Sequence, residues 1–382
     1  MSSKRLLSVV AYAGAIFMIY QILSYIHMWQ TVQPIDQSFS ELLKKEILQN
    51  YDLSNIASEE EMKNALNLIL LKYALDSKSK NGKVDPVLNP ALNNKGVDSG
   101  NGANPIFNGD YILNNVSVCP DNLEVIVVVH TAPDHFIRRQ NIRTTYGSST
   151  MFLPVNIRTV FLVGRVKTAE KQAVINTEYS RYGDIIQGNF IDAYHNLTYK
   201  AVMGLHWVSH YCSQAKYVVK LDDDVVFDMW RFLSMFHARN RFMSNSMYCY
   251  VRVDGKIHRK GKWEVPKEMF KGYSSYPFQH CIGFTVIYSG DIIPALYRAS
   301  FKEPFFWLDD VYVTGILRIA AGGIQLNQHT RDNLLRPTLG GLQCLQELGR
   351  KCTYLSMGAT EETFHATWHA VKRRSHNPLR KT

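Results

Sequence analysis

Three short runs of β-branched and other apolar residues stand out along the chain, at residues 123–129, 159–164 and 217–221. A strand with one face in water alternates polar and apolar residues. Runs as apolar as 123–129 instead predict strands buried on both faces, as in a parallel sheet. A shorter run at 184–186 predicts one more strand of the same kind.

Helical patterns lie between these runs. Residues 136–146 and 196–208 have helical spacing, and residues 311–317 form another helical stretch that is closed by Gly322 and Gly323. Strands that alternate with helices predict an α/β fold whose central sheet is mainly parallel.

The N-terminus carries the longest apolar stretch. Residues 6–28 follow Lys4 and Arg5 and contain no charged side chain, and their most apolar part, Leu6–His27, would be roughly 33 Å long as a helix. We therefore expect a cytoplasmic tail at 1–5 and a transmembrane signal anchor at 6–28, with the rest of the chain lumenal. A cleaved signal peptide is the alternative, but no clear small-x-small site follows the run.

Two regions are expected beyond the anchor. Residues 29–118 read as a lumenal stem and linker, because residues 76–110 are rich in Asn, Gly, Ser, Lys and Pro and cannot bury enough apolar area to order themselves. Residues 119–382 are expected to form the catalytic domain.

Composition narrows the class of protein. The chain is 46% hydrophobic and 20% charged with a net charge of +10, which excludes a disordered protein. No nucleic-acid-binding motif is visible, so we expect no nucleic-acid partner. One rival interpretation is a basic protein that binds polyanionic glycans through residues 372–382.

The six cysteines fit a secretory route. None forms a CxxC, which argues against a zinc ribbon, and an even number beyond a membrane anchor predicts disulfides. Cys344 and Cys352 are close in a hydrophilic stretch and are expected to pair. Asn115 and Asn196 begin two candidate glycosylation sequons, although such tripeptides are common by chance.

Three adjacent carboxylates, Asp222, Asp223 and Asp224, follow the strand predicted at 217–221. Ligands of open α/β sheets bind outside the carboxyl ends of the strands. Neighbouring carboxylates repel one another unless a cation is present, and oxygen ligands suit Mg²⁺ or Mn²⁺. The position predicts a metal site that would bridge to a diphosphate, whereas an acidic turn that caps the next helix is the plain alternative.

A second acidic pair, Asp309 and Asp310, precedes the helical stretch at 311–317. A carboxylate at a helix N-terminus is stabilised by the helix dipole, so a capping role is a fair interpretation. The other interpretation is a general base that takes a proton from an acceptor hydroxyl. The spacing alone leaves both open.

Seven segments in register resemble the β-1,3-galactosyltransferase family, which also includes β-1,3-N-acetylglucosaminyl- and N-acetylgalactosaminyltransferases. The similarity runs from about residue 123 to the tail, and its segments are Arg138–Tyr146, Phe161–Gly164, Tyr182–Ile186, Asn189–Lys200, Cys212–Val225, Tyr276–Gly283 and Asp309–Tyr312.

The resemblance implies a GT-A type nucleotide-sugar-binding fold, a UDP-sugar donor, Mn²⁺ or Mg²⁺, and inversion at the anomeric carbon. By position, Asp222 and Asp224 fall in the metal and nucleotide motif, with Asp224 as the expected direct ligand and Asp223 beside it on the donor side. Asp310 falls where the family places its catalytic base.

Further roles follow from the same resemblance. Arg139, Arg143 and Lys200 fall in donor-side motifs, where cations could offset phosphate charge, while ordinary surface or sheet-flanking charges are the plain alternative. Cys212 and Cys281 match two cysteines of the family and are expected to pair, which leaves Cys119 and Cys249 bonded together or free.

The departures from the family concern specificity and the metal. Tyr146 replaces a usual Trp and Asp309 a usual Glu, and Thr285 and Val286 stand where a glycine and an aromatic residue are usual. The family's late histidine has no counterpart at the usual distance. His365 is a candidate third metal ligand, as are His329 and His369.

The sequence therefore predicts a single-pass type II Golgi membrane enzyme that moves a hexose, with galactose first, from a UDP-sugar to a glycan on protein or lipid in β-1,3 linkage. N-acetylgalactosamine and N-acetylglucosamine are the alternative sugars. A protein of another class, an inactive Golgi protein that binds glycans or assists a partner, is the main rival. The acceptor and the oligomeric state are not predicted.

Overall fold

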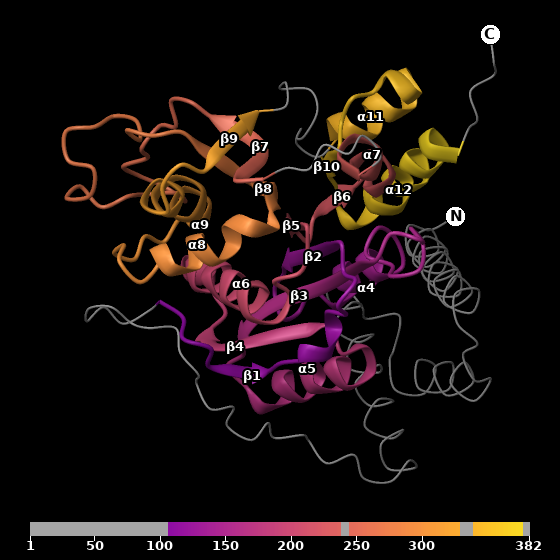
Figure 1. The fold of residues 1–382 in the computed structure, drawn as a ribbon, viewed down its shortest axis with the longest axis horizontal. Helices are drawn as coiled ribbons and strands as arrows, with labels where there is room; N and C mark the ends of the chain where they lie inside the picture. Colours follow the sequence, from indigo (N-terminus) through magenta and orange to yellow (C-terminus); the bar gives the residue numbers. More distant parts are fainter. Residues whose placement is uncertain (1–105, 238–243, 329–338, 377–382) are drawn as a thin grey trace, which may run out of the picture. The chain divides into compact units, whose positions relative to one another are not determined.

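The computed structural model describes residues 106–237, 244–328 and 339–376 (Figure 1), all within one compact unit, Val97–Thr382. Its centre is an eight-stranded sheet with the strand order β1-β4-β3-β2-β5-β8-β7-β9. The strands are β1 (Tyr111–Leu113), β2 (Val125–His130), β3 (Ile157–Arg165), β4 (Ile185–Ile191), β5 (Tyr217–Asp222), β7 (Ser246–Arg252), β8 (His280–Ser289) and β9 (Gln325–Gln328).

The strands that the sequence predicted form the parallel half of this sheet. β2 runs parallel to both β3 and β5, with Val125 opposite Ile157 on one side and Tyr217 on the other. β4 runs parallel to β3. All six residues of β2 are buried, which confirms the prediction of a buried parallel strand and a mainly parallel α/β sheet.

The other half of the sheet is largely antiparallel and was not predicted. β8 runs antiparallel to β5, with Leu221 opposite Thr285, and β7 runs antiparallel to β8. β9 then pairs with β7 in parallel. Because β8 runs against β5, the carboxyl end of β5 lies beside the first residues of β8, including Gly283.

Helices cover both faces of the sheet. They are α4 (Phe136–Arg143), α5 (Ala169–Tyr182), α6 (Leu197–Tyr211), α7 (Met229–Phe232), α8 (Ile293–Ala299), α9 (Asp309–Val311), α10 (Arg318–Ala320), α11 (Leu339–Leu348) and α12 (Glu361–His376). Short 3-10 or π segments are η1 (Val116–Val118), η2 (Tyr194–Asn196), η3 (Leu233–His237), η4 (Gly290–Ile292), η5 (Tyr312–Leu317) and η6 (Gly349–Lys351).

Successive side chains of a strand point to opposite faces, so β2 contributes to two cores. Ile126 packs in one core with Trp207 of α6, and Val127 packs in the other with Trp368 of α12. The apolar character of β2 on both faces therefore follows from helices on both sides of the sheet.

A second, two-stranded sheet joins the C-terminal region to the rest of the molecule. β10 (Ser356–Gly358) pairs antiparallel with β6 (Val225–Phe227), the strand that follows the three aspartates. Figure 1 shows α11 and α12, in yellow, beside these two strands. The backbone N–H of Ala359 also donates to the carbonyl of Asp224, at 2.7 Å. The C-terminal region thus supports the backbone at the third aspartate.

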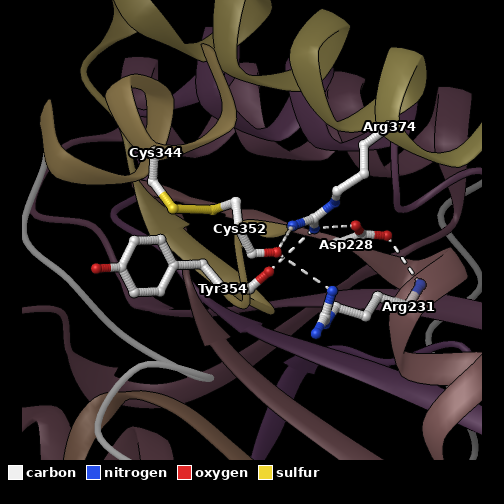
Figure 2. The surroundings of a disulfide bond; sticks show 6 residues. All are labelled: Asp228, Arg231, Cys344, Cys352, Tyr354 and Arg374. Atoms are coloured by element: carbon white, nitrogen blue, oxygen red, sulfur yellow. Dashed lines mark hydrogen bonds and ion pairs between the residues drawn. A yellow bond between two sulfur atoms is a disulfide. The ribbon is translucent and has the colours of Figure 1, made fainter. Parts of the chain in front are cut away.

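Figure 2 shows how this region is fastened. The guanidinium of Arg374, on α12, forms a buried ion pair with Asp228 and donates to the carbonyls of Cys352 and Tyr354 at 2.8 and 3.0 Å. Asp228 in turn accepts a hydrogen bond from the backbone N–H of Arg231, at 2.9 Å, and so caps α7. Arg374 therefore ties α12 to the turn after β6.

The disulfides agree only in part with the sequence analysis. Cys344 and Cys352 are bonded, which confirms the expected local pair. The expected Cys212–Cys281 bond is wrong, because Cys212 pairs with Cys119 and Cys281 pairs with Cys249, with Cα atoms 5.5 and 5.6 Å apart. The reason is topological: Cys249 and Cys281 lie on the neighbouring strands β7 and β8, whereas Cys212 follows α6 and meets the residue that follows η1.

Residues before the boundary expected at 119 also contribute to the sheet and to the core. Tyr111 of β1 pairs with Gly188 of β4, and Phe107 is buried in the core. In the part of the chain that the structure describes, no helix is long and apolar enough to cross a membrane. The anchor expected at residues 6–28 lies outside the described residues.

Candidate active site

The candidate site lies where the carboxyl ends of β2 and β5 meet the start of β8. His130, the last residue of β2, is directly opposite Asp222, the last residue of β5. Parallel strands bring their carboxyl ends to the same edge of a sheet, which is why the three aspartates face the loop that follows β2. Each of the three has different surroundings.

Asp223 is held by the protein itself. Its carboxylate accepts hydrogen bonds from the Thr131 hydroxyl at 2.6 Å and from Arg138 at 3.0 Å, and it lies 2.7 Å from Nδ1 of His135. Burial opposes the charged form, but the hydrogen bonds from His135 and Thr131 and the charge of Arg138 outweigh it and lower the pKa of Asp223. This carboxylate fastens the loop after β2, and the donor-side role expected for it stays a prediction.

Asp222 forms an ion pair with a lysine of its own strand. Nζ of Lys220 lies 2.6 Å from Oδ1 of Asp222, and both side chains leave the same face of β5. Burial raises the pKa of Asp222 to about 7, although Lys220 acts in the opposite direction. About a third of the Asp222 side chain stays exposed, at 36%, so one side of the carboxylate faces solvent.

Asp224 has an oxygen that the protein leaves unpaired. Its Oδ1 is buried and has no hydrogen-bond partner among the described residues. Burial, with the charge of Asp223 added, raises the pKa of Asp224. A buried carboxylate oxygen without a donor is costly unless a ligand or a cation completes it.

A divalent cation would satisfy that oxygen, and carboxylate oxygens are the ligands that Mg²⁺ and Mn²⁺ prefer. Asp222 and Asp224 therefore fit the metal that the sequence predicts. The described residues contain no group of three or more His, Cys, Asp or Glu side chains placed to hold a metal ion. Within the described ranges the protein therefore supplies two candidate oxygen ligands here, and the candidate ligand His329 lies outside these ranges.

His365 lies on α12 and contacts Asn141 of α4, with Nε2 3.1 Å from the amide oxygen. Burial, together with the neighbouring His369, lowers the pKa of His365 and keeps its ring neutral at pH 7. The described contacts of His365 join two helices, and the structure does not place it in a ligand group with the aspartates.

The second acidic pair lies on the other side of Lys220. Asp310 packs against Gly283 so closely that a Cβ at position 283 would come within 3.2 Å of the Asp310 Cβ. Lys220 donates to the carbonyl of the same glycine. The side chain of Lys220 therefore connects Asp222 to the residue that Asp310 packs on, and the structure brings together the two acidic groups that the sequence singled out.

Asp310 has the environment of a proton acceptor. Its Oδ1 accepts a hydrogen bond from the backbone N–H of Val311, at 2.7 Å. Burial, and then the charge of Asp309, raises its pKa to about 6. Its backbone carbonyl accepts from the Thr314 hydroxyl, which itself accepts from the N–H of Cys281 in β8. Asp310 is thus fixed to the sheet while its carboxylate is weakly acidic.

Asp309 faces the end of β2. Its Oδ2 lies 3.7 Å from Nδ1 of His130. Burial, with Lys220 and Lys200 nearby, holds the pKa of His130 well below its usual range, so the imidazole is neutral and the contact carries no net ion pair. Asp309 and Asp310, although adjacent, therefore have different partners.

A small cavity of about 40 Å³ lies between α6 and the sheet, with His130, Lys220, Gly283, Asp309 and Asp310 among its lining residues. Small-molecule sites usually measure about 300–1,000 Å³. The cavity is too small for a sugar, so a ligand of these carboxylates would have to lie on their solvent side.

The three predicted donor-side cations are paired inside the protein. Arg139 is fully buried and forms two hydrogen bonds with Glu178, at 2.8 and 2.7 Å. Arg143 forms two hydrogen bonds of 2.7 Å with Asp184. Nζ of Lys200 lies 2.9 Å from Asp192. In this conformation none of the three presents a free charge to a ligand.

Two of these cations hold the loop after β2. Arg139 donates to the carbonyls of Ala132 and Pro133, and Lys200 donates to the carbonyl of Thr131, all between 2.6 and 2.9 Å. Since Thr131 also binds Asp223, these cations position the aspartates through the loop. The donor-side role that the resemblance implies for Arg139, Arg143 and Lys200 stays a prediction.

Lys220 and Arg138 were not selected as site residues from the sequence. A lysine inside an otherwise apolar strand could have indicated the site, because a buried cation requires an acidic or carbonyl partner nearby. Arg138 differs from Arg139 in that its side chain is 28% exposed and lies near the aspartates, bound to Asp223. It is the cation of this helix that remains accessible.

The two predicted sequons have ordered asparagines. The Asn115 amide donates to the carbonyl of Gly183, and the Asn196 amide donates to the carbonyl of Ile191, both at 2.8 Å. Glycosylation at either position stays a prediction, and a glycan on these amide nitrogens would alter both bonds.

Known proteins resemble this chain over its central part. The sequence profile described as galactosyltransferase matches residues 137–329. The chain is 32% identical to Beta-1,3-galactosyltransferase 1 of Mus musculus over 216 residues, which are 55% of this chain and 64% of that protein. It is 30% identical to Beta-1,3-galactosyltransferase 5 of Homo sapiens over 191 residues, 50% of this chain and 61% of the relative. The matches therefore span less than two thirds of these relatives.

Solved structures align only loosely. The WbbM bifunctional glycosyltransferase aligns with a TM-score of 0.35 and 10% identity, over 67% of this chain and 50% of that one. The galactosyltransferase LgtC in complex with donor and acceptor sugar analogs aligns with a TM-score of 0.33 and 9% identity, over 66% of this chain and 98% of that one.

Proposed function

This chain belongs to the galactosyltransferase family, and from that premise we propose that it is an inverting β-1,3-glycosyltransferase that moves a hexose from a UDP-sugar to a glycan acceptor. Galactose is the first choice of sugar, on the basis of the relatives' names. One observation carries the proposal: Lys220 joins Asp222 to Gly283, against which Asp310 packs.

In this proposal the carboxyl end of β5 is the donor side, in a GT-A type arrangement. Asp222 and Asp224 would hold Mn²⁺ or Mg²⁺, because one offers a partly exposed carboxylate and the other an unpartnered oxygen. A bound divalent ion would supply positive charge for the departing diphosphate. Arg138 is the accessible cation beside them and is suited to a phosphate oxygen.

Asp310 acts as the general base. With a pKa of about 6 it is mostly ionised at pH 7, yet it is a stronger base than an ordinary aspartate. It would take the proton from the acceptor hydroxyl as that oxygen forms its bond to the anomeric carbon and the bond from that carbon to the UDP oxygen breaks. Direct displacement of this kind inverts the anomeric centre.

The proposed compartment is the Golgi lumen, with the expected anchor at residues 6–28 in the membrane. Three disulfides support a lumenal location, because such bonds form and persist in the oxidising secretory pathway.

The test is turnover by the purified full chain. The assay supplies Mn²⁺, a panel of β-glycoside acceptors and one of three donors: UDP-galactose, UDP-N-acetylgalactosamine or UDP-N-acetylglucosamine. The linkage of the product is determined by NMR. We expect one donor to be preferred and a β-1,3 product. If none of the three donors is consumed by a folded protein, with or without acceptor, the proposal is wrong and the inactive glycan-binding alternative takes its place.

A further inference from the structure

Trp307, two positions before Asp309, belongs to a group of aromatic side chains that the proposed chemistry does not use. Tyr194 and His195 of η2, Trp263 in the segment between β7 and β8, and Trp307 just before α9 come from three separate parts of the chain. We name these four residues the aromatic platform.

The members of the platform contact one another. The rings of His195 and Trp307 have centroids 4.6 Å apart, and those of Tyr194 and Trp307 are 6.1 Å apart. Nε1 of Trp263 donates to the Tyr194 hydroxyl at 3.0 Å. Contacts at these distances show a built surface in which each ring limits the orientation of the next.

The platform is open to solvent. Trp263 is 49% exposed and Tyr194 is 41% exposed, and His195 is also exposed. Large aromatic side chains carry a high cost when left in water, so a contiguous exposed group of them indicates a binding surface. Trp307 is half-buried, so it joins this exposed surface to the body of the protein.

The polar edges of both tryptophans are already occupied. Nε1 of Trp307 donates to the carbonyl of Glu264, at 3.1 Å, just as Nε1 of Trp263 donates to Tyr194. Since the N–H groups are engaged by the protein, the indoles can offer a ligand only their apolar faces. A flat apolar ring face suits a partner with a flat apolar face of its own.

Polar groups surround the rings. The ammonium of Lys262 lies 4.6 Å from the centre of the Tyr194 ring, and the imidazole of His258 lies 5.6 Å from that of Trp263. Apolar faces with a few polar groups around them match a pyranose ring, whose C–H groups form an apolar face and whose hydroxyls project from its rim. Three or four rings are too few for a stable protein interface, which buries about 800 Å² on each partner.

The platform is tied to the acidic pair. Trp307 is two positions before Asp309, and the carbonyl of Phe306 accepts a hydrogen bond from the Thr198 hydroxyl at the start of α6, at 2.6 Å. η2 ends where α6 begins, so this bond fixes Tyr194 and Trp307 to the same point of the fold. The platform is thus linked to the acidic pair by two residues of chain.

From these contacts we propose that the aromatic platform is the acceptor subsite, and that it binds a sugar ring of the acceptor glycan by stacking on Trp263 and Trp307. This inference rests on the proposed function for the reaction that follows, but the binding itself does not need turnover. The platform holds the acceptor, and Asp310 takes the proton from its hydroxyl.

The matched variants are Trp263→Ala and Tyr273→Ala. Both residues lie in the segment between β7 and β8, and Tyr273, at 55% exposed, matches Trp263, at 49%, in exposure and aromatic character. Trp307→Phe is a second platform variant, which keeps an aromatic ring next to Asp309 and avoids a cavity there.

Binding is measured by saturation-transfer NMR on the full chain without donor, using the methyl β-glycosides of galactose, N-acetylglucosamine and N-acetylgalactosamine as probes. We expect a saturation-transfer signal from at least one probe with the unmodified chain. Trp263→Ala should weaken the affinity for that probe about tenfold, and Tyr273→Ala should leave it unchanged. Absence of transfer to all three probes, or equal loss in Tyr273→Ala, would overturn the inference.

Kinetics separate this inference from the proposed function. In Trp263→Ala and Trp307→Phe, the KM for acceptor should rise, whereas Tyr273→Ala should leave it unchanged. An unchanged acceptor KM in both variants overturns the acceptor subsite while leaving the transferase intact. If the unmodified chain consumes no donor but still binds a probe, the proposed function fails and the platform stands as a glycan site. A change in oligomeric state on Trp263→Ala, seen by light scattering, would instead assign the platform to a second copy of the chain and overturn the inference.

Discussion

Lys220 and Asp222 leave the same face of β5 and form an ion pair, with Nζ and Oδ1 2.6 Å apart. Because Lys220 also donates to the carbonyl of Gly283, one ammonium group is shared between the carboxylate at the end of β5 and the strand against which Asp310 packs. The charge of Lys220 thus balances acidic groups on two elements at once.

Replacing Lys220 with methionine should therefore impair both folding and activity. The change leaves Asp222 without its counter-charge, and we expect a loss of about 1–3 kcal/mol in the free energy of unfolding, less than for a fully buried pair because Asp222 is 36% exposed. Urea unfolding measures this. The double variant Lys220→Met with Asp222→Asn should recover part of the loss, and a loss equal to the sum of the single variants would contradict the pairing.

Asp310→Asn should abolish most turnover without weakening UDP binding. A general base typically contributes about 10²–10⁴-fold, and a direct displacement has no second nucleophile to compensate. Calorimetric titration of UDP with Mn²⁺ present, beside turnover, gives both numbers. Asp309→Asn is the control, since Asp309 faces the neutral His130 and should cost far less activity. Near-normal turnover in Asp310→Asn would make Asp309 the better candidate.

The rate should fall below about pH 6. Burial, with the charge of Asp309 added, raises the pKa of Asp310 to about 6, and a base works only when deprotonated, so kcat/KM should drop about tenfold per pH unit below that value. The free energy of unfolding should depend on pH in the opposite direction from the rate. A carboxyl whose folded pKa is raised above its ordinary value of about 3.9 loses its contribution as pH rises through the window between the two values. A pH–rate profile with no acid limb would contradict the role of Asp310.

Asp224→Asn should weaken UDP binding as well as turnover, and only when metal is present. The unpartnered Oδ1 of Asp224 is the group that a divalent ion would complete, and an amide binds such ions more weakly than a carboxylate. Chelator should abolish activity of the unmodified chain and Mn²⁺ should restore it. Full activity in excess chelator would exclude the proposed metal site.

Arg139→Met should destabilise the fold by up to about 3–5 kcal/mol, because it breaks a buried ion pair and leaves Glu178 with Arg143 as its remaining charged partner. Arg139→Met combined with Glu178→Met should be more stable than the single variant, since it removes both charges. Thermal and chemical unfolding check this. If Arg139→Met kept full stability but lost UDP binding, the donor-side role that the resemblance implies for Arg139 would be supported instead.

The parallel half of the sheet was predictable because its strands are buried on both faces, and a short β-branched run that is apolar throughout is typical of such strands. β9, with the sequence Gln-Leu-Asn-Gln, and β7, with tyrosines and serine among its residues, carry no such run. Their pairing depends on β8, a neighbour distant in sequence, and no local pattern records that.

The position of the aspartates was predictable, because it depends only on where a parallel strand ends. Asp222 and Asp224 had to lie at the carboxyl end of a parallel strand, whereas the direction of β8, which brings Gly283 and Asp310 to that end, was not visible. The burial of the arginines could not be predicted from the sequence. Nothing local distinguishes the buried Arg139 from the partly exposed Arg138, because the difference arises from Glu178, thirty-nine positions away. The cysteine pairing likewise follows from the β7–β8 contact.

The ion pair between Arg374 and Asp228 makes the fold sensitive to loss of the last turns of α12 (Figure 2). A premature stop codon or frameshift before codon 374 would remove one charge and leave the other buried in the turn that directly follows β6. Such an allele should yield a protein that is retained and degraded by quality control in the cell, even though every proposed catalytic residue is still encoded.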